Sequence, residues 1–166
     1  MTSICTFPTK DSVNLWHCEN DTVMGGVSQS QIKYLNEDAR HRGILVFEGS
    51  VSLENNGGFA QMLYENDLLD LSQCSHLELT LKGDGKNYQV RIETRSTHVG
   101  YSQTFATTHE WSTVKLAFAD FTPDFHGEPV PDAPPLDLTQ IKNIGILIGN
   151  NQEESFRLLL NEVRCY

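Results

Sequence analysis

Residues 76–94 read HLELTLKGDGKNYQVRIET, and this stretch decides the fold class. From His76 to Lys82 leucines alternate with polar side chains, and the same period of two returns from Tyr88 to Thr94. Such alternation is typical of a β-strand with one buried face. Gly83-Asp84-Gly85 lies between the two stretches and can supply the positive φ angles of a tight turn. The sequence therefore predicts a β-hairpin here.

Other parts of the chain have the same strand character, which brings the expected total to about nine strands. These further strands are expected at residues 31–35, 44–47, 59–64, 101–107, 112–118, 144–148 and 156–163. Turn sequences such as Asn55-Asn56-Gly57-Gly58 separate them. Many short strands at this spacing indicate an all-β sandwich or barrel.

Helix is expected to be scarce. Residues 67–72 and 138–142 are each predicted to form one helical turn, the second capped by Asp137 or Thr139. Five of the six prolines fall in residues 122–135, which we interpret as an extended surface loop. The whole chain, residues 1–166, is predicted to be one β-sandwich domain, long enough to bury about two-thirds of its unfolded surface.

The composition favours a folded, acidic protein. Hydrophobic residues make up 39% and charged residues 20% of the chain, which indicates a globular rather than a disordered protein. Acidic side chains number 22 against 12 basic ones, so the formal charge is −10. Because such a surface repels phosphate backbones, we expect no nucleic-acid partner.

The sequence also predicts where the protein is found and the state of its cysteines. The first residues lack the basic flank and apolar run of a secretory signal, and no apolar stretch nears the roughly 20 residues that span a bilayer. We therefore expect a cytoplasmic protein without direct membrane insertion. The four cysteines, Cys5, Cys18, Cys74 and Cys165, are expected to be free thiols there, with a Cys5–Cys165 bridge as the alternative.

Enzyme signatures are absent from the linear sequence. Gly26-Val27-Ser28-Gln29-Ser30 is one glycine short of a nucleophile elbow, and Gly83-Asp84-Gly85 opens a strand instead of a phosphate-binding helix. The six histidines lack metal-ligand spacing. We predict no catalysis, no cofactor and no metal. Two carboxylates and an arginine brought together in a deep pocket would contradict this.

Three glycine-bearing motifs follow one another along the chain. They are NDTVMGGVS at residues 20–28, VSLENNGGFA at residues 51–60 and KGDGKNY at residues 82–88. Taken singly, each is a turn, because glycines permit left-handed backbone and close approach of a neighbour. We expect Asp21, Asn55 and Asn56 to hold these turns by accepting hydrogen bonds from backbone amides.

As an ordered set, the motifs resemble the complex I intermediate-associated protein 30 family. In that family a D-G-V-M-G-G-x-S motif follows a tryptophan, here Trp16, and V-S-L-x-N-N-G-G-F and G-D-G-x-x-Y segments come later. Two positions depart from the pattern: Thr22 replaces a glycine, and Leu63 stands where members commonly have an arginine. The resemblance covers about residues 13–163 and implies a galactose-binding-domain-like jelly-roll β-sandwich.

The resemblance also implies a function. Mitochondrial relatives are assembly factors for respiratory complex I, and plastid relatives act in photosystem assembly. We therefore predict a non-catalytic, chaperone-like module that binds a protein partner, for example a subunit of a membrane or respiratory complex. Its candidate surface is the pair of glycine loops, with Asp21, Met24, Asn55, Asn56 and Phe59. Met24 and Phe59 either form an exposed apolar patch or pin their loops to the core.

The alternative function is carbohydrate binding by the concave face of the jelly roll. Gln89, Arg91 and Glu93 point away from the buried face of their strand, and Arg95 follows them. Arg91, Glu93 and Arg95 are therefore the candidate residues of this face. The row can equally be a solvated strand face with cross-strand charge pairs, each worth roughly 0.2–1 kcal/mol. Trp16 and Trp111 are expected to pack inside, which leaves the face few aromatic platforms for sugars.

Overall fold

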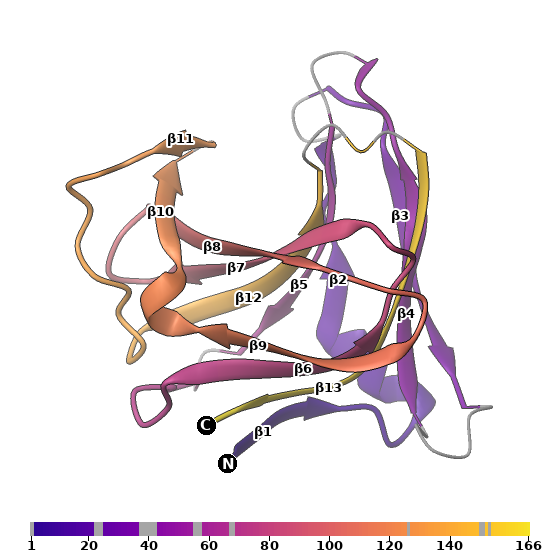
Figure 1. Ribbon diagram of the computed structural model, residues 1–166, viewed down its shortest axis with the longest axis horizontal. Helices are drawn as coiled ribbons and strands as arrows, with labels where there is room; N and C mark the ends of the chain where they lie inside the picture. The colour runs from indigo at the N-terminus through magenta and orange to yellow at the C-terminus, as the bar shows by residue number, and fades with distance from the viewer. Residues whose placement is uncertain are drawn as a thin grey trace.

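The chain forms two antiparallel β-sheets that pack face to face (Figure 1). This computed structural model describes residues 2–21, 25–36, 43–54, 58–66, 69–125, 127–149, 152 and 154–166. The predicted all-β sandwich is confirmed. Thirteen strands are present in these residues, because short strands near the N-terminus and after residue 121 add to the nine that the sequence indicated.

The first sheet has six strands, and the last strand of the chain is at its centre. The order is β3 (Gln29–Leu35), β4 (Ile44–Val51), β13 (Glu154–Cys165), β6 (His76–Lys82) and β9 (Trp111–Ala117), and β1 (Thr2–Thr6) also pairs with β13. One edge of β13 binds β4 along its first half and β1 along its second. The two ends of the chain therefore lie side by side (Figure 1).

The second sheet has seven strands. Its order is β11 (Glu128–Pro129), β10 (Thr122–Phe125), β8 (Gly100–Ala106), β7 (Asn87–Thr94), β12 (Ile141–Ile148), β5 (Ala60–Glu65) and β2 (Trp16–Cys18). Two short 3-10 helices, η1 (Lys10–Leu15) and η4 (Phe118–Asp120), complete the described elements. Neither they nor any other helix of the described residues is long and apolar enough to span a bilayer.

Alternate residues of both sheets form one core between them. Tyr88, Val90 and Ile92 of β7 are fully buried, which confirms the period of two that the sequence shows. From the other sheet, Phe47 and Phe156 meet with ring centroids 4.9 Å apart, and Phe156 also contacts the edge of Tyr88. The burial of these apolar side chains is the main force that holds the two sheets together.

Five chain connections cross from one sheet to the other at the same end of the sandwich, which we call the arch end. These arches are residues 19–28, 52–59, 83–86, 107–110 and 149–153. The strand registers bring their ends together. The paired positions are Gln29 with Ser50, Val51 with Glu154, Ala60 with Ile148, Lys82 with Trp111 and Asn87 with Ala106. All three glycine motifs lie in arches.

The predicted hairpin at residues 76–94 is wrong. β6 lies between β13 and β9 in one sheet, whereas β7 lies between β12 and β8 in the other. Two strands that face each other across a core bury the same alternate residues as two strands of one sheet, so the pattern does not distinguish the cases. The connection turns inward at Gly83, where a Cβ atom would lie 2.1 Å from the Cβ of Thr107.

Residues 122–135 are also more regular than predicted. They contain β10 and β11 at the edge of the seven-stranded sheet, where proline is tolerated because one side of the strand needs no donor. The hydroxyl of Tyr101 donates to the carbonyl oxygen of Pro134 at 2.6 Å and fixes the chain that follows. Residues 138–140 form a turn, not the expected helix, in which Asp137 accepts from the amide of Thr139. Of the other predicted helix, residues 67 and 68 lie outside the described part, and residues 69–72 are not helical.

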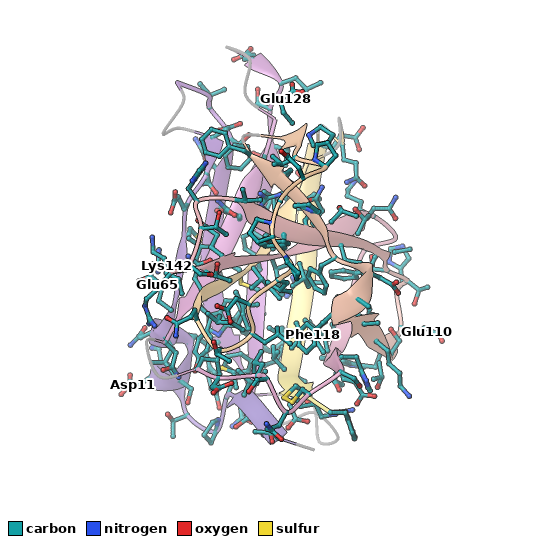
Figure 2. The ribbon with its side chains drawn as sticks, turned by 90° about the vertical axis from the view of Figure 1, so that its left-hand side faces the viewer. Asp11, Glu65, Glu110, Phe118, Glu128 and Lys142 are labelled. Atoms are coloured by element: carbon teal, nitrogen blue, oxygen red, sulfur yellow. A yellow bond between two sulfur atoms is a disulfide. The ribbon has the colours of Figure 1, made fainter. Side chains whose placement is uncertain are left out.

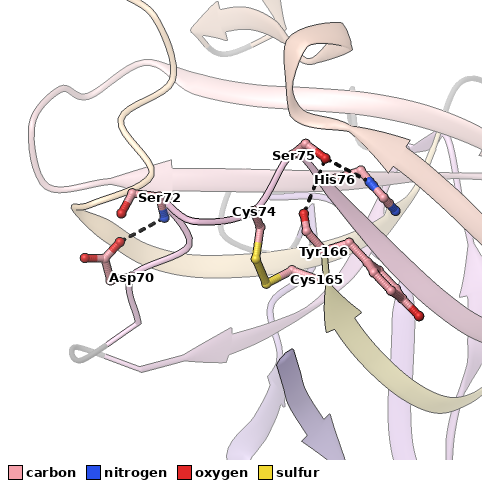
Figure 3. Close-up of a disulfide and its surroundings, with 7 residues drawn as sticks. All are labelled: Asp70, Ser72, Cys74, Ser75, His76, Cys165 and Tyr166. Carbon is pink, nitrogen blue, oxygen red and sulfur yellow. Dashed lines mark hydrogen bonds between the residues drawn. A yellow bond between two sulfur atoms is a disulfide. The ribbon is translucent and has the colours of Figure 1, made fainter. Parts of the chain in front are cut away.

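Two of the four cysteines form a disulfide, so the expectation of four free thiols is wrong (Figure 3). Cys74 precedes β6 and Cys165 ends β13, and the pairing of these two strands brings their Cα atoms to 5.8 Å. The alternative Cys5–Cys165 bridge is wrong as well. Cys5 lies opposite Val163, and its sulfur accepts a hydrogen bond from Trp16 Nε1 at 3.4 Å. Cys5 and Cys18 are free.

We predict that Gly83→Ala lowers the free energy of unfolding by about 1–3 kcal/mol, because the new methyl group overlaps the buried Thr107 side chain. Gly127→Ala is the matched control. Gly127 has a positive φ of 82° but open space around it, so backbone strain alone should cost roughly 1 kcal/mol. Urea unfolding followed by tryptophan fluorescence measures both. A cost for Gly83→Ala no larger than for Gly127→Ala would contradict the close packing of the arches.

Candidate functional site

The carboxylate of Asp21 joins the first two glycine motifs. Its Oδ1 accepts from the amide of Ser28 at 3.0 Å, and its Oδ2 accepts from the Ser28 hydroxyl at 2.6 Å and the Gly58 amide at 2.7 Å. The amide of Phe59 donates to the same Oδ2 at 3.3 Å. Asp21 is fully buried, so these donors replace the water it loses on folding. The prediction that Asp21 holds its loop by backbone hydrogen bonds is confirmed.

Two small residues complete this junction. A Cβ atom on Gly26 would lie 2.4 Å from Cγ of Asp21, so glycine is needed where the chain passes the carboxylate. The hydroxyl of Ser28, which donates to Asp21, also accepts from the amide of Ser52 at 2.9 Å. The described residues of arches 19–28 and 52–59 are therefore joined by hydrogen bonds around Asp21.

The carboxylate of Asp84 holds the third motif by accepting hydrogen bonds, as Asp21 does for the first two. Its Oδ2 accepts from the Tyr88 hydroxyl at 3.0 Å and from the amide of Arg157 on β13 at 2.8 Å, and its Oδ1 accepts from the amide of Lys86. Burial, and then the nearby charge of Asp84, raise the pKa of Tyr88, which keeps its hydroxyl a donor. The motif residues thus fasten the arches, and their carboxylates face protein donors rather than a ligand.

The fastened arches present apolar side chains to solvent. Val27 is 42% exposed and Leu53 is 39% exposed, and they flank the junction of Ser28 with Ser52. Phe59 is half-buried. The other predicted residues of this surface, Met24, Asn55 and Asn56, lie outside the described residues, as does Thr22.

The other predicted residues lie on a different surface, the outer face of the seven-stranded sheet. Arg91 reaches across β8 and forms a bidentate pair with Asp124 of β10, with N–O distances of 2.8 and 3.2 Å. Gly100 makes room for this, because a Cβ there would lie 2.9 Å from the guanidinium. Glu93 is exposed and accepts from Asn143, whereas Arg95 follows the end of β7. The pair ties β10 to β7 across β8. This is the cross-strand charge pairing that the sequence analysis gave as one of two possibilities.

Leu63 lies in the middle of the same face. It is 4% exposed, and it packs over Gly145, where a Cβ would lie 2.8 Å from its Cδ2 atom. The registers place Gly145 between Leu63 and Arg91. Leu63 thus places an apolar side chain two strands from Arg91.

Aromatic side chains are absent from this face in the described strands. The outward residues of its central strands are Gln61, Leu63, Glu65, Asn143, Gly145, Leu147, Gln89, Arg91, Glu93, Ser102 and Thr104. Trp16 is buried against Tyr64, as expected. Trp111 is only half-buried on β9 of the other sheet, so the prediction that both tryptophans pack inside is wrong for Trp111.

An open depression of about 530 Å³ lies on β3, β4 and β13 of the six-stranded sheet. Glu48, Asp84 and Arg157 line it, a combination that sequence reasoning missed because the three come from distant segments. Glu48 is paired with Arg157 and with Lys33, and Asp84 is bound to three donors. The depression is wide open, so it is not the deep pocket that would indicate catalysis. The described residues also contain no group of three or more metal-ligating His, Cys, Asp or Glu side chains.

We expect the stability that Asp21 provides to depend on pH. Burial alone would raise the pKa of its carboxyl group, but the hydrogen bonds from Ser28, Gly58 and Phe59 lower it below the ordinary value. Because the folded-state pKa is the lower one, this stabilisation is complete above about pH 4 and is lost as the pH falls through the folded-state value.

We therefore predict that Asp21→Asn lowers the free energy of unfolding at pH 7 by at least about 2 kcal/mol, since an NH₂ group would face buried donors. Below about pH 4 the difference from the parent protein should shrink. Urea unfolding between pH 3 and pH 7 measures this, with Asp132→Asn at an exposed site as the control. A difference that stays constant over this range would show that the charge of Asp21 is not what stabilises the arches.

The fold is similar to that of carbohydrate-binding modules. A family 11 module from Clostridium thermocellum, in complex with a beta-1,3-1,4-mixed-linked tetrasaccharide, has a TM-score of 0.77 and 15% identity over 99% of this chain and 94% of the module. A family 29 module has a TM-score of 0.58 and 10% identity, covering 100% of this chain and 91% of that chain. At such identities the likeness concerns the fold alone.

Sequence relatives give a more specific result. An uncharacterized protein of Schizosaccharomyces pombe is 27% identical over 176 residues, covering 90% of this chain and 79% of the relative. A probable complex I intermediate-associated protein 30, mitochondrial, of Caenorhabditis elegans is 25% identical and covers 96% of this chain, which spans about half (52%) of that relative. The family description of complex I intermediate-associated protein 30 matches residues 5–160. The chain therefore belongs to the complex I intermediate-associated protein 30 family.

Proposed function

We propose that this protein is a non-catalytic binding module that holds a protein partner during the assembly of a larger complex. Its family and the name of the C. elegans relative support respiratory complex I, or a related membrane complex, as the place of that partner. The proposal rests on the hydrogen bonds of Asp21, which join the described residues of two arches. Val27 and Leu53, the apolar side chains beside these bonds, are exposed to solvent.

The arch end suits protein recognition for two physical reasons. Loops that a rigid sandwich holds in place lose little conformational freedom when a partner binds, so less of the binding free energy goes into ordering them. Val27 and Leu53 are exposed apolar side chains that directly precede Ser28 and follow Ser52, which are bonded to each other, and the exposed carboxylates of Glu19 and Glu54 lie on the same arches. An apolar centre with a polar rim is the usual composition of a protein–protein interface.

We predict that replacing both Val27 and Leu53 with Asp reduces the recovery of a specific partner complex by at least about tenfold, because central apolar contacts often contribute 2 kcal/mol or more. The measurement is mild crosslinking in the native host, capture of the tagged protein and mass spectrometry. Leu15→Asp is the matched control, since Leu15 is 56% exposed on η1. Asp11, in the first turn of η1, is labelled in the lower part of Figure 2, whereas β3, which follows the first arch, begins near the top of Figure 1.

Equal recovery with the double variant and the parent protein would reject the arch end as the docking surface. Equal loss with Leu15→Asp would show that the effect is not specific to the arches. Fractionation of the same cells tests the cytoplasmic location that we expect from the sequence, against the mitochondrial location in the relative's name. All variants are checked for an unchanged melting temperature before capture.

A second candidate function is carbohydrate binding on the outer face of the seven-stranded sheet. The family 11 module has the same fold and was solved with a tetrasaccharide, and the outward amides of Gln61 and Gln89 flank Leu147 on this face. The lack of aromatic platforms in the described strands and the commitment of Arg91 to Asp124 weigh against it. Protein binding is therefore the better supported function.

If the outer face binds sugars, a mixed-linked β-1,3-1,4-glucan tetrasaccharide should give a saturable heat of binding in a calorimetric titration. Gln89→Ala should then weaken the affinity by roughly tenfold, the loss expected for one hydrogen bond to a ligand. Gln31→Ala, on the other sheet, is the control and should have no effect. No measurable heat at millimolar sugar would remove this function.

A further inference from the structure

Asn143 has a buried side-chain oxygen without a donor, and it is the one such atom among the described residues. The residue is 4% exposed on β12, and it points to the outer face because its neighbour Ile144 points into the core. Its Nδ2 donates to Oε1 of Glu93 at 3.4 Å. The reverse orientation of the amide would set its oxygen against that carboxylate. The oxygen of Asn143 therefore faces away from Glu93, toward the β5 side.

The neighbours of Asn143 in the sheet are acceptors as well. The registers place Asn143 between Glu65 on β5 and Glu93 on β7, so the three residues form one row across adjacent strands. Ionised carboxylates have no hydrogen to donate. Glu65 has Nε2 of His17 at 3.9 Å from its Oε1, and Glu93 accepts the bond from Asn143, whereas Asp124 on the same face is paired with Arg91. Within this row of acceptors, the buried oxygen of Asn143 has no donor.

A positively charged donor that makes several hydrogen bonds fits this row best, because two of its three acceptors are carboxylates. Buried oxygens without donors are rare in native proteins, because each one costs stability. An ammonium group has three N–H donors and a full positive charge, which matches one amide oxygen between two carboxylates. A calcium ion would need six to eight oxygen ligands, more than this row offers. Adjacent strands are about 4.8 Å apart, so an ammonium group above Asn143 is within reach of all three side chains.

We propose that the row of Glu65, Asn143 and Glu93 binds the ammonium group of a lysine side chain. Glu65 and Glu93 are exposed and can move apart, so the group enters from the outer face. The net charge of −10 attracts a partner that carries such lysines. The statement that the lysine belongs to a protein partner rests on the proposed function. The affinity of the site for an ammonium group does not depend on that function.

The probe is a blocked tripeptide, acetyl-Gly-Lys-Gly-amide, titrated at low salt and followed by NMR shifts of the backbone amides of Glu65, Glu93 and residue 143, which every variant keeps. We expect saturable shifts with this peptide and none with its ε-acetylated form, which has lost the charge. Asn143→Leu and Glu93→Gln should each weaken binding by roughly tenfold or more, because hydrogen bonds to charged groups are the strong ones. Glu54→Gln, at the arch end, is the matched control and should bind normally.

Equal shifts with the acetylated peptide, or an unchanged affinity in Glu93→Gln, would overturn the proposal. Shifts with calcium chloride but not with the lysine peptide would overturn it too. If Asn143→Leu does not fold, Glu93→Gln decides the question alone, since Glu93 is exposed. The peptide titration uses no partner complex, so a negative result would not contradict the proposed docking surface at the arch end. A negative capture experiment would likewise not contradict lysine binding by this row.

Discussion

The buried carboxylate of Asp21 is the interaction on which the arch end depends. An ionised group without water is stable only when donors surround it, and here the donors come from two arches that are about thirty residues apart in sequence. The carboxylate therefore joins the arches by the same bonds that satisfy its own charge. Residue 26 must be small, because a Cβ atom there would overlap the carboxylate. Residue 28 must carry a donor, because its hydroxyl binds the carboxylate. One charge thus explains much of the first two motifs.

The same logic applies to the rest of the sandwich. Because each arch moves the chain from one sheet to the other, backbone groups at the strand ends lose their neighbours there. The carboxylate of Asp84 accepts a hydrogen bond from the backbone amide of Arg157. The side chain of Gln152 accepts from the backbone amide of Asn87 and donates to its carbonyl oxygen. Here side chains bond the backbone N–H and C=O groups that have no partner in a neighbouring strand, because such groups need a hydrogen bond when they are buried. The family motifs are the places where this happens.

Local patterns in the sequence were sufficient for the fold class and for the inward and outward residues of β7. They predicted the role of Asp21 because an aspartate in a turn binds nearby amides. They failed where the partner is distant: alternation at residues 76–94 does not tell a hairpin from two facing strands, and Cys74 meets Cys165 only through the pairing of β6 with β13. Pro123 concealed β10, because proline disfavours most strands, whereas here it is paired with Tyr101 of β8 and precedes the residues that pair with the short edge strand β11.

The candidate surfaces were predictable to different degrees. The outward direction of Arg91 and Glu93 follows from the period of two, but Asp124 and Asn143 do not, since they come from strands brought alongside by the topology. Asn143 gave no signal at all, because it precedes an apolar run and reads as the start of a strand. For the glycine loops, the sequence pointed to Met24 and Phe59, whereas the structure adds Val27 and Leu53 as the exposed apolar side chains.

The central position of β13 has a consequence for the synthesis of the protein. On the ribosome β13 emerges after all the strands it binds, so β1, β4 and β6 leave the exit tunnel before the strand that joins them. Until then the six-stranded sheet has a gap at its centre, with the pairing edges of its strands open to water. Unpaired edges of this kind invite aggregation. Until β13 has left the exit tunnel, the nascent chain therefore exposes these open strand edges, and a chain that lacks β13 cannot form this sheet.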